Sequence, residues 1–155
     1  MLATIAQALA HTDPHRDSVG FGTFLSWGNG GGILFGWLDK TTDEVLKSWK
    51  EDPTQPPRDA EYRIVALRPG QTVYLPPGLV HLVCRTRANG NTLLYGGHIL
   101  RPSDMRSWLD LVVDLEQFPD TTNEDSDDAN PYILAGAQIL SDLRPGSAED
   151  AWGGP

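Results

Sequence analysis

Residues 68–86 read RPGQTVYLPPGLVHLVCRT, and this stretch does most to decide the fold. Two apolar runs, TVYL and VHLVC, are separated by a Pro-Pro-Gly sequence, and a Pro-Gly pair precedes them. Proline fixes φ and glycine reaches positive φ without strain, so both residues mark turns. The pattern predicts two short strands joined by a tight turn, with His81 near the start of the second strand.

Short apolar runs between turn residues continue in both directions from this stretch. YRIVAL precedes it, TLLYGGHIL follows it, and residues 21–38 contain two further runs around the glycine cluster GNGGG. The 155 residues include 16 glycines and 12 prolines, which favours many short elements over long helices. The sequence therefore predicts a mainly β fold, either a sandwich or a barrel.

Helical patterns occur outside these runs. Residues 2–10 place apolar side chains at helical spacing, and residues 103–115 repeat them at i, i+3, i+4 and i+7. Residues 41–44 match a capping box, which predicts a short helix that ends near Lys50. A further helix is expected within residues 132–143.

Composition and charge restrict the function. A net charge of −9 without a basic run argues against direct binding to nucleic acid. Cys84 is the only cysteine, so an internal disulfide is impossible and a reducing compartment is expected. The N-terminus lacks the basic start of a signal peptide, and no apolar stretch reaches membrane-spanning length. We expect an intracellular protein of one domain with tails, with no membrane partner.

Two copies of a His-x-Asp pattern lie near the start of the chain, at residues 11–13 and 15–17. Residues i and i+2 of an extended strand point to the same face, so either pair can reach one ion. Such a pair and one distant histidine make the facial triad of a non-haem Fe(II) site. His81 is the best distant partner because a rigid turn precedes it, and His98, which follows two glycines, is the reserve candidate.

The stretches PHRDSVGFGTF, RPGQTVYLPPGLVHLVCRT and LLYGGHIL resemble the JmjC domain of Fe(II)- and 2-oxoglutarate-dependent oxygenases. The resemblance covers roughly residues 11–116 and is greatest to the histone lysine demethylase branch. That branch has a T-D-x-H-x-D motif, present here from Thr12 to Asp17, and a P-G-x-T-x-x-x-P-x-G-x-x-H motif, present from Pro69 to His81. The sequence GGH at 96–98 replaces that branch's GGN.

This resemblance implies a double-stranded β-helix, a cupin-like jelly roll, with a few peripheral helices. It also implies that His15, Asp17 and His81 bind Fe(II) and that Thr12 orients the cosubstrate 2-oxoglutarate. The family places a threonine three residues before the ligand histidine, which favours His15 over His11 as the ligand. His11, four residues from His15, would then share its strand face near the mouth of the site. The implied reaction is hydroxylation of a protein side chain or demethylation of methyl-lysine, with a histone tail among the candidate substrates and the nucleus or the cytoplasm as the location.

The sequence departs from the family at the position of a lysine that usually binds the distal carboxylate of 2-oxoglutarate. Counting along the chain places Gly32 or Ile33 there, and neither can pair with a carboxylate. Lys40, Arg63 and Arg85 are alternative bases. This departure leaves two other functions open, a non-catalytic JmjC-like module that binds a protein partner and a small-molecule cupin enzyme with another cosubstrate.

Three segments are expected along the chain. Residues 1–118 would form the jelly-roll domain, 119–131 an acidic linker, and 132–155 a C-terminal helix with a loose tail. The acidic run at 114–128 could attract a basic peptide by electrostatic steering. Only fourteen residues precede His15, fewer than the family normally has, so a short or truncated member is expected. The sequence does not predict the oligomeric state.

Overall fold

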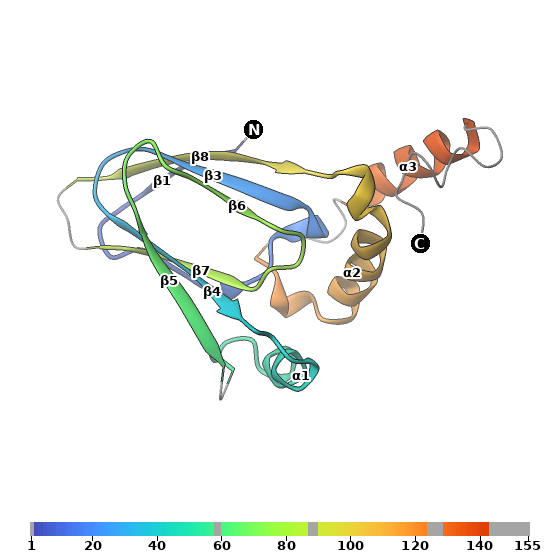
Figure 1. The fold of residues 1–155 in the computed structure, drawn as a ribbon, viewed down its shortest axis with the longest axis horizontal. Helices are drawn as coiled ribbons and strands as arrows, with labels where there is room; N and C mark the ends of the chain where they lie inside the picture. The colour runs from blue at the N-terminus through green and yellow to red at the C-terminus, as the bar shows by residue number, and fades with distance from the viewer. Residues whose placement is uncertain (1, 58–59, 87–89, 124–128, 143–155) are drawn as a thin grey trace.

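The computed structural model describes residues 2–57, 60–86, 90–123 and 129–142. The described chain is mainly β, with a few helices at one end of two facing sheets (Figure 1). The strands are β1 (Leu2–Ala6), β2 (His11–His15), β3 (Gly22–Asn29), β4 (Ile33–Asp39), β5 (Glu61–Leu67), β6 (Thr72–Leu75), β7 (His81–Arg85) and β8 (Thr92–Ile99). The α-helices are α1 (Asp43–Glu51), α2 (Met105–Gln117) and α3 (Asn130–Asp142), and short 3-10 turns are η1 (Ser18–Gly20), η2 (Pro102–Asp104) and η3 (Pro119–Thr121).

The strand order defines a jelly roll. One four-stranded sheet has the order β1-β8-β3-β6 and the other β2-β7-β4-β5. The antiparallel pairs β1–β8, β2–β7, β3–β6 and β4–β5 are those of a double-stranded β-helix, in which a long folded hairpin is wound across two sheets. The two sheets face each other as a sandwich and are not hydrogen-bonded into a closed barrel among the described residues. The predicted cupin-like jelly roll is therefore confirmed.

The expected helix over residues 2–10 is wrong. Residues 2–6 form β1, which pairs with β8 from Leu2 opposite Gly96 to Ala6 opposite Thr92. A helix this short is marginal on its own, whereas β8 offers a row of backbone groups to pair with. Ile5 is 70% exposed, so burial of the apolar residues does not decide the conformation.

The other expected elements are present. The helix predicted near residues 43–50 is α1, where Thr42 Oγ1 accepts a hydrogen bond from the N–H of Val45 at 3.3 Å. Helix α2 buries the predicted apolar stripe, except that Leu109 is 43% exposed. Residues 124–128 of the expected acidic linker and residues 143–155 of the expected tail lie outside the described residues.

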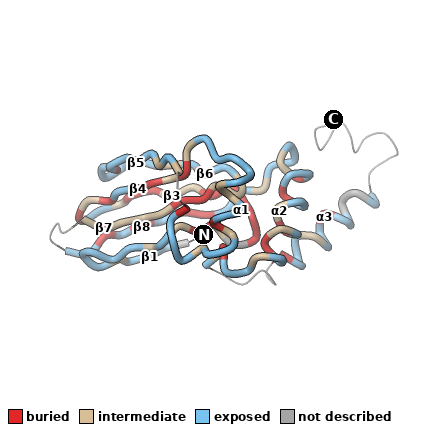
Figure 2. The backbone as a smooth tube through the Cα atoms, turned by 90° about the horizontal axis from the view of Figure 1, so that it is seen from below, coloured by how far each residue is buried: buried red, intermediate tan, exposed pale blue. Residues whose placement is uncertain are grey.

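Buried residues, red in Figure 2, form three core clusters among the described residues: one between the sheets, one beneath α2 and one against α1. Large side chains of both sheets, including Trp27, Ile33 and Phe35, pack in the sandwich. At the end where α2 lies, Trp108 packs with Val19 and Phe21. Helix α2 therefore covers the residues that follow His15, and α3 extends beyond it (Figure 1). No described helix is long and apolar enough to span a bilayer.

Candidate metal centre

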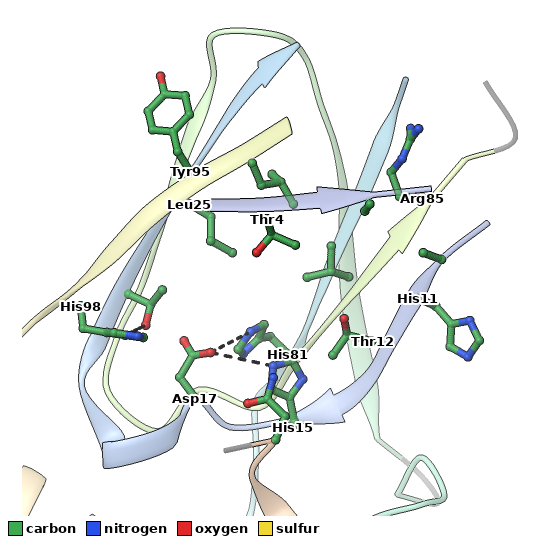
Figure 3. A pocket seen from close by; sticks show the side chains of 16 residues that line it. Thr4, His11, Thr12, His15, Asp17, Leu25, His81, Arg85, Tyr95 and His98 are labelled. Atoms are coloured by element: carbon green, nitrogen blue, oxygen red, sulfur yellow. Dashed lines mark hydrogen bonds and ion pairs between the residues drawn. The ribbon is translucent and has the colours of Figure 1, made fainter. Parts of the chain in front are cut away.

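His15 and Asp17 lie where β2 leaves the sheet. The strand ends at His15, and Asp17 follows in extended conformation (φ −60°, ψ 144°) just before η1. Both residues were expected on one strand, but only His15 belongs to it. The extended backbone nevertheless preserves the alternation, and both side chains face the cavity between the sheets (Figure 3).

The Pro-Pro-Gly turn determines where β7 begins. The N–H of Leu79 donates to the carbonyl of Pro76 at 3.3 Å, and Gly78 has a φ of 73°. This positive φ strains residues other than glycine, so the sequence and the turn match. Strand β7 then starts at His81, which lies directly opposite His15 in the antiparallel register.

The three side chains converge on one point (Figure 3). Asp17 Oδ1 lies 3.8 Å from Nε2 of His15 and 3.7 Å from Nε2 of His81, and one ligand atom of each residue lies within 4.8 Å of the others. Neighbouring ligands of a first-row ion, each at about 2.1 Å from it, lie about 3 Å apart. The carboxylate-to-imidazole separations exceed this value by less than about 1 Å, which small side-chain rotations can close.

Both imidazoles are held in the form that a metal requires. Nδ1 of His15 lies 2.8 Å from the carbonyl of Asp13, and Nδ1 of His81 lies 3.0 Å from that of Leu79. A carbonyl only accepts, so each Nδ1 carries the proton and donates it. In the neutral ring the lone pair is then on Nε2, which faces Asp17. The backbone therefore fixes both tautomers for coordination through Nε2.

Electrostatics favour the neutral ring of His81. The side chain of His81 is 2% exposed, and burial is the main cause that lowers its pKa. Nearby His15 lowers the pKa further, whereas Asp17 and the Leu79 carbonyl raise it. Phe35 stacks on the ring with centroids 5.5 Å apart, which contributes to this burial. A neutral imidazole is the form that binds metal.

Arg16, between the two candidate ligands of the His-x-Asp pair, points the opposite way and anchors the segment. The residue is 3% exposed, and its Nη1 donates to Asp114 Oδ2 on α2 at 2.7 Å. Its Nη2 donates to Thr121 Oγ1, also at 2.7 Å. Lys50 Nζ donates to the other oxygen of Asp114 at 2.5 Å. Sequence reasoning missed this network, although alternation already required Arg16 to face away from the site and a buried arginine needs an acidic partner.

A second contact from α2 supports the turn after Asp17. Val19 has a φ of 60°, which is strained for a β-branched residue. Its carbonyl accepts a hydrogen bond at 2.5 Å from Nε1 of Trp108, which is fully buried. Nothing in the sequence links these two residues, so only the structure could identify this contact.

The triad lies in a cavity of about 250 Å³, and the other residues singled out from the sequence lie around it. Thr12 lines the cavity and pairs with Val83 in the register. A β-bulge between Thr12 and His15 shifts the alternation, so Thr12 shares the inner face with His15. The ring of His11 lies at the rim and turns away from the triad in Figure 3, with its side chain 66% exposed.

His98, the reserve candidate, also lines the cavity but does not belong to the group of converging ligand atoms. Its Nδ1 lies 3.0 Å from Oγ1 of Thr23, which is 1% exposed. His98 is therefore positioned by a neighbouring strand at the edge of the site.

Neither position expected for the family's lysine carries a charge. Ile33 is 1% exposed and belongs to the core between the sheets. Gly32 precedes β4, and a Cβ there would lie 2.9 Å from Thr86 Oγ1. Of the alternative bases, Lys40 and Arg63 have side chains 73% and 63% exposed. Arg85 lines the cavity that contains the triad.

Comparison with known proteins gives likenesses of fold alone. No protein-family model matches the sequence, and no curated protein matches it. Among solved structures, peruvianin-I, a cysteine peptidase from Thevetia peruviana latex, is similar with a TM-score of 0.41 and 16% identity over 63% of this chain and 53% of that one. Hydroxypropylphosphonic acid epoxidase from S. wedmorenis, in complex with fosfomycin, has a TM-score of 0.40 and 14% identity over 63% of this chain and 42% of that one. A cupin-like protein from Thermotoga maritima has a TM-score of 0.36 and 14% identity over 79% of this chain and 72% of that one.

Proposed function

We propose that the chain is a metal-dependent oxygenase of the JmjC type, with His15, Asp17 and His81 as ligands of Fe(II). The convergence of two Nε2 atoms and one carboxylate oxygen, with both Nδ1 protons donated to the backbone, carries this proposal. Two imidazoles and one carboxylate form the facial set that suits ferrous iron and leaves other coordination positions open. Bound Fe(II) supplies the activation of O₂ that these side chains cannot perform.

The chain's own residues bind and orient in this proposal. His15, Asp17 and His81 hold the ion, and Thr12 offers a hydroxyl to a cosubstrate such as 2-oxoglutarate. The apolar side chains of Leu25, Val83 and Leu94 line the same cavity and limit the access of water. The substrate proposed from the motif is a protein side chain, including methyl-lysine of a histone tail.

A titration with Fe(II) under anaerobic conditions tests the site. We expect one ion per chain in the wild type and a loss of most of the affinity in His81→Ala, because that variant leaves two ligands. His11→Ala is the matched control and should bind like the wild type, since the His11 ring turns away from the triad. Equal affinity in the wild type and in His81→Ala would exclude the site.

One observation favours a second function, a binding module without turnover. Gly32 or Ile33 stands where the family has the lysine that holds 2-oxoglutarate, and loss of one charge-assisted hydrogen bond weakens a ligand about ten- to a hundredfold. Formation of succinate from 2-oxoglutarate with Fe(II) and O₂ distinguishes the two functions. Succinate formation that His81→Ala abolishes supports the oxygenase, whereas Fe(II) binding without turnover supports the module.

A further inference from the structure

Arg85 is a buried cation with no carboxylate partner among the residues that the structure describes. The residue is 4% exposed. Nη1 donates to the carbonyl of Gly32 at 3.2 Å, and Nη2 donates to the carbonyl of Gly90 at 2.5 Å. Its buried Nε has no hydrogen-bond partner. A guanidinium has five N–H donors, so most of them remain unused, and the positive charge is not neutralised.

Comparison with Arg16, the other buried arginine in the described part of the chain, shows that this is unusual. Arg16 is 3% exposed and also has an unpartnered Nε, but Asp114 lies 2.7 Å from its Nη1 and neutralises it. Arg63, on β5 of the same sheet, is exposed and pairs with Asp39 at 2.6 Å. Burial of an unpaired charge is unfavourable, so a buried arginine without an acid indicates an anionic ligand.

The position of Arg85 places this charge in the cavity of the triad. His81, Val83 and Arg85 alternate along β7, and all three line the cavity. Four residues along a strand span about 13 Å between Cα atoms, so the cation and the triad lie toward opposite ends. Figure 3 shows Arg85 well separated from Asp17. Arg85 also lies directly opposite Ile33 in the register, and Ile33 is one of the two positions expected for the family's lysine.

We propose that Arg85 binds a carboxylate of the ligand that this cavity takes, so that the ligand is a carboxylic acid held at one end by Arg85 while its other end faces the triad. A carboxylate can accept two parallel hydrogen bonds from a guanidinium, which gives direction as well as charge. The role assigned to the triad rests on the proposed function. The role of Arg85 does not depend on turnover.

Pairs of 2-oxo acids test the proposal by calorimetry on the full chain loaded with Zn(II). Each pair consists of a diacid and the monoacid of equal chain length in which a methyl group replaces the distal carboxylate, namely 2-oxoglutarate with 2-oxopentanoate and 2-oxoadipate with 2-oxohexanoate. We expect the wild type to bind at least one diacid tenfold or more tightly than its partner. Arg85→Gln should bind the two acids of that pair equally, and Arg85→Lys should keep part of the preference because it keeps the charge. Arg63→Gln, which changes an exposed arginine on β5 of the same sheet, should keep the full preference.

Comparing the two acids within one variant separates a loss of recognition from a loss of structure. Arg85 also joins two loops, so a structural defect in Arg85→Gln would weaken the binding of both acids alike. A diacid preference that survives in Arg85→Gln overturns the proposal, and so does a wild type that prefers neither diacid or binds no acid. His81→Ala separates the two proposals. An Arg85-dependent preference without metal binding by the triad would contradict the proposed function alone, whereas metal binding by the triad without a preference would contradict this inference alone.

Discussion

At the scale of single residues, the side chains around His15 alternate between two faces, and each face has a different role. His15 and Asp17 face the cavity, whereas Arg16 faces α2 and is held by Asp114 and Thr121. Both ligand candidates are therefore fixed through the residue between them. Because Arg16 is buried, the stability of the segment from His15 to Asp17 depends on the negative charge of Asp114.

Asp114→Asn should destabilise the fold by on the order of 2–4 kcal/mol at neutral pH, because it leaves the buried Arg16 without an anion. Burial tends to raise the pKa of Asp114, but hydrogen bonds and charge from Lys50 and Arg16 outweigh it and lower the pKa below the ordinary 3.8. A lowered carboxyl pKa contributes stability above the ordinary value and loses it as the pH falls through the folded-state value. Urea unfolding from pH 7 to pH 3 should therefore show the difference between wild type and variant shrinking in acid, and a constant difference would contradict this.

Ile33, one of the two positions expected for the family's lysine, is buried in the core between the sheets. Ile33→Lys, which restores the charge expected from the family pattern, should lower the free energy of unfolding by on the order of 3 kcal/mol or more. The ammonium would be buried in the core and lie opposite the cationic Arg85. Leu34→Lys is the matched control, because Leu34 is 37% exposed and should tolerate the charge. Equal unfolding midpoints in urea for the two variants would contradict the expectation.

At the scale of elements, α2 closes one end of the sandwich and supports the candidate ligands from behind. It contributes Asp114 to Arg16 and Trp108 to the carbonyl of Val19. A strained turn at Val19 persists only if its surroundings hold it, and α2 supplies both the hydrogen bond and the packing. The helix therefore belongs to the site, although it contributes no candidate ligand.

Trp108→Phe should reduce both stability, by about 1–2 kcal/mol, and Fe(II) affinity, because the buried carbonyl of Val19 loses its donor and the turn after Asp17 relaxes. Trp27→Phe is the matched control, since Trp27 is also buried but its Nε1 has no hydrogen-bond partner. That variant should lose packing and keep Fe(II) affinity. Thermal unfolding and Fe(II) titration of both variants measure the difference, and an unchanged affinity in Trp108→Phe would show that the turn does not depend on α2.

At the scale of the whole molecule, residues after α2 return to the jelly roll. The carbonyl of Thr121 accepts a hydrogen bond from the backbone N–H of Arg16 at 2.9 Å, and the hydroxyl of Thr121 accepts one from the guanidinium of Arg16. Beyond it, Tyr132 packs edge-on against Phe21 with ring centroids 4.7 Å apart. We propose that the jelly-roll domain extends past the boundary expected at residue 118, because segments after α2 pack against it.

A chain that ends at Phe118 should therefore unfold at a lower temperature than the full chain and bind Fe(II) less tightly. Thr121→Val in the full chain should show part of the loss of stability, because it removes the hydroxyl and keeps the backbone carbonyl. Circular dichroism during heating and Fe(II) titration measure both effects. A shortened chain with the stability and affinity of the full chain would place the functional boundary at residue 118.

The residue pattern by itself predicted a mainly β sandwich or barrel, because alternation and Pro-Gly turns are local rules that act within a few residues. The jelly roll and the choice of His15, Asp17 and His81 came from the resemblance to the JmjC family, since the pattern alone left His11 and His98 open as ligands. Residues 2–10 were mispredicted because a short apolar pattern does not show whether a neighbouring strand edge is available, and β8 supplies one.

Only the tertiary structure decided what holds and surrounds the candidate ligands. Arg16 and Asp114 are 98 residues apart in the chain, and Val19 and Trp108 are 89 apart. The same holds for Arg85, which is buried, has no carboxylate partner among the described residues and lies opposite Ile33 through the pairing of β4 with β7. Such contacts leave no periodic signal in the sequence, since the distance between two side chains is set by the packing of whole elements and not by their spacing along the chain.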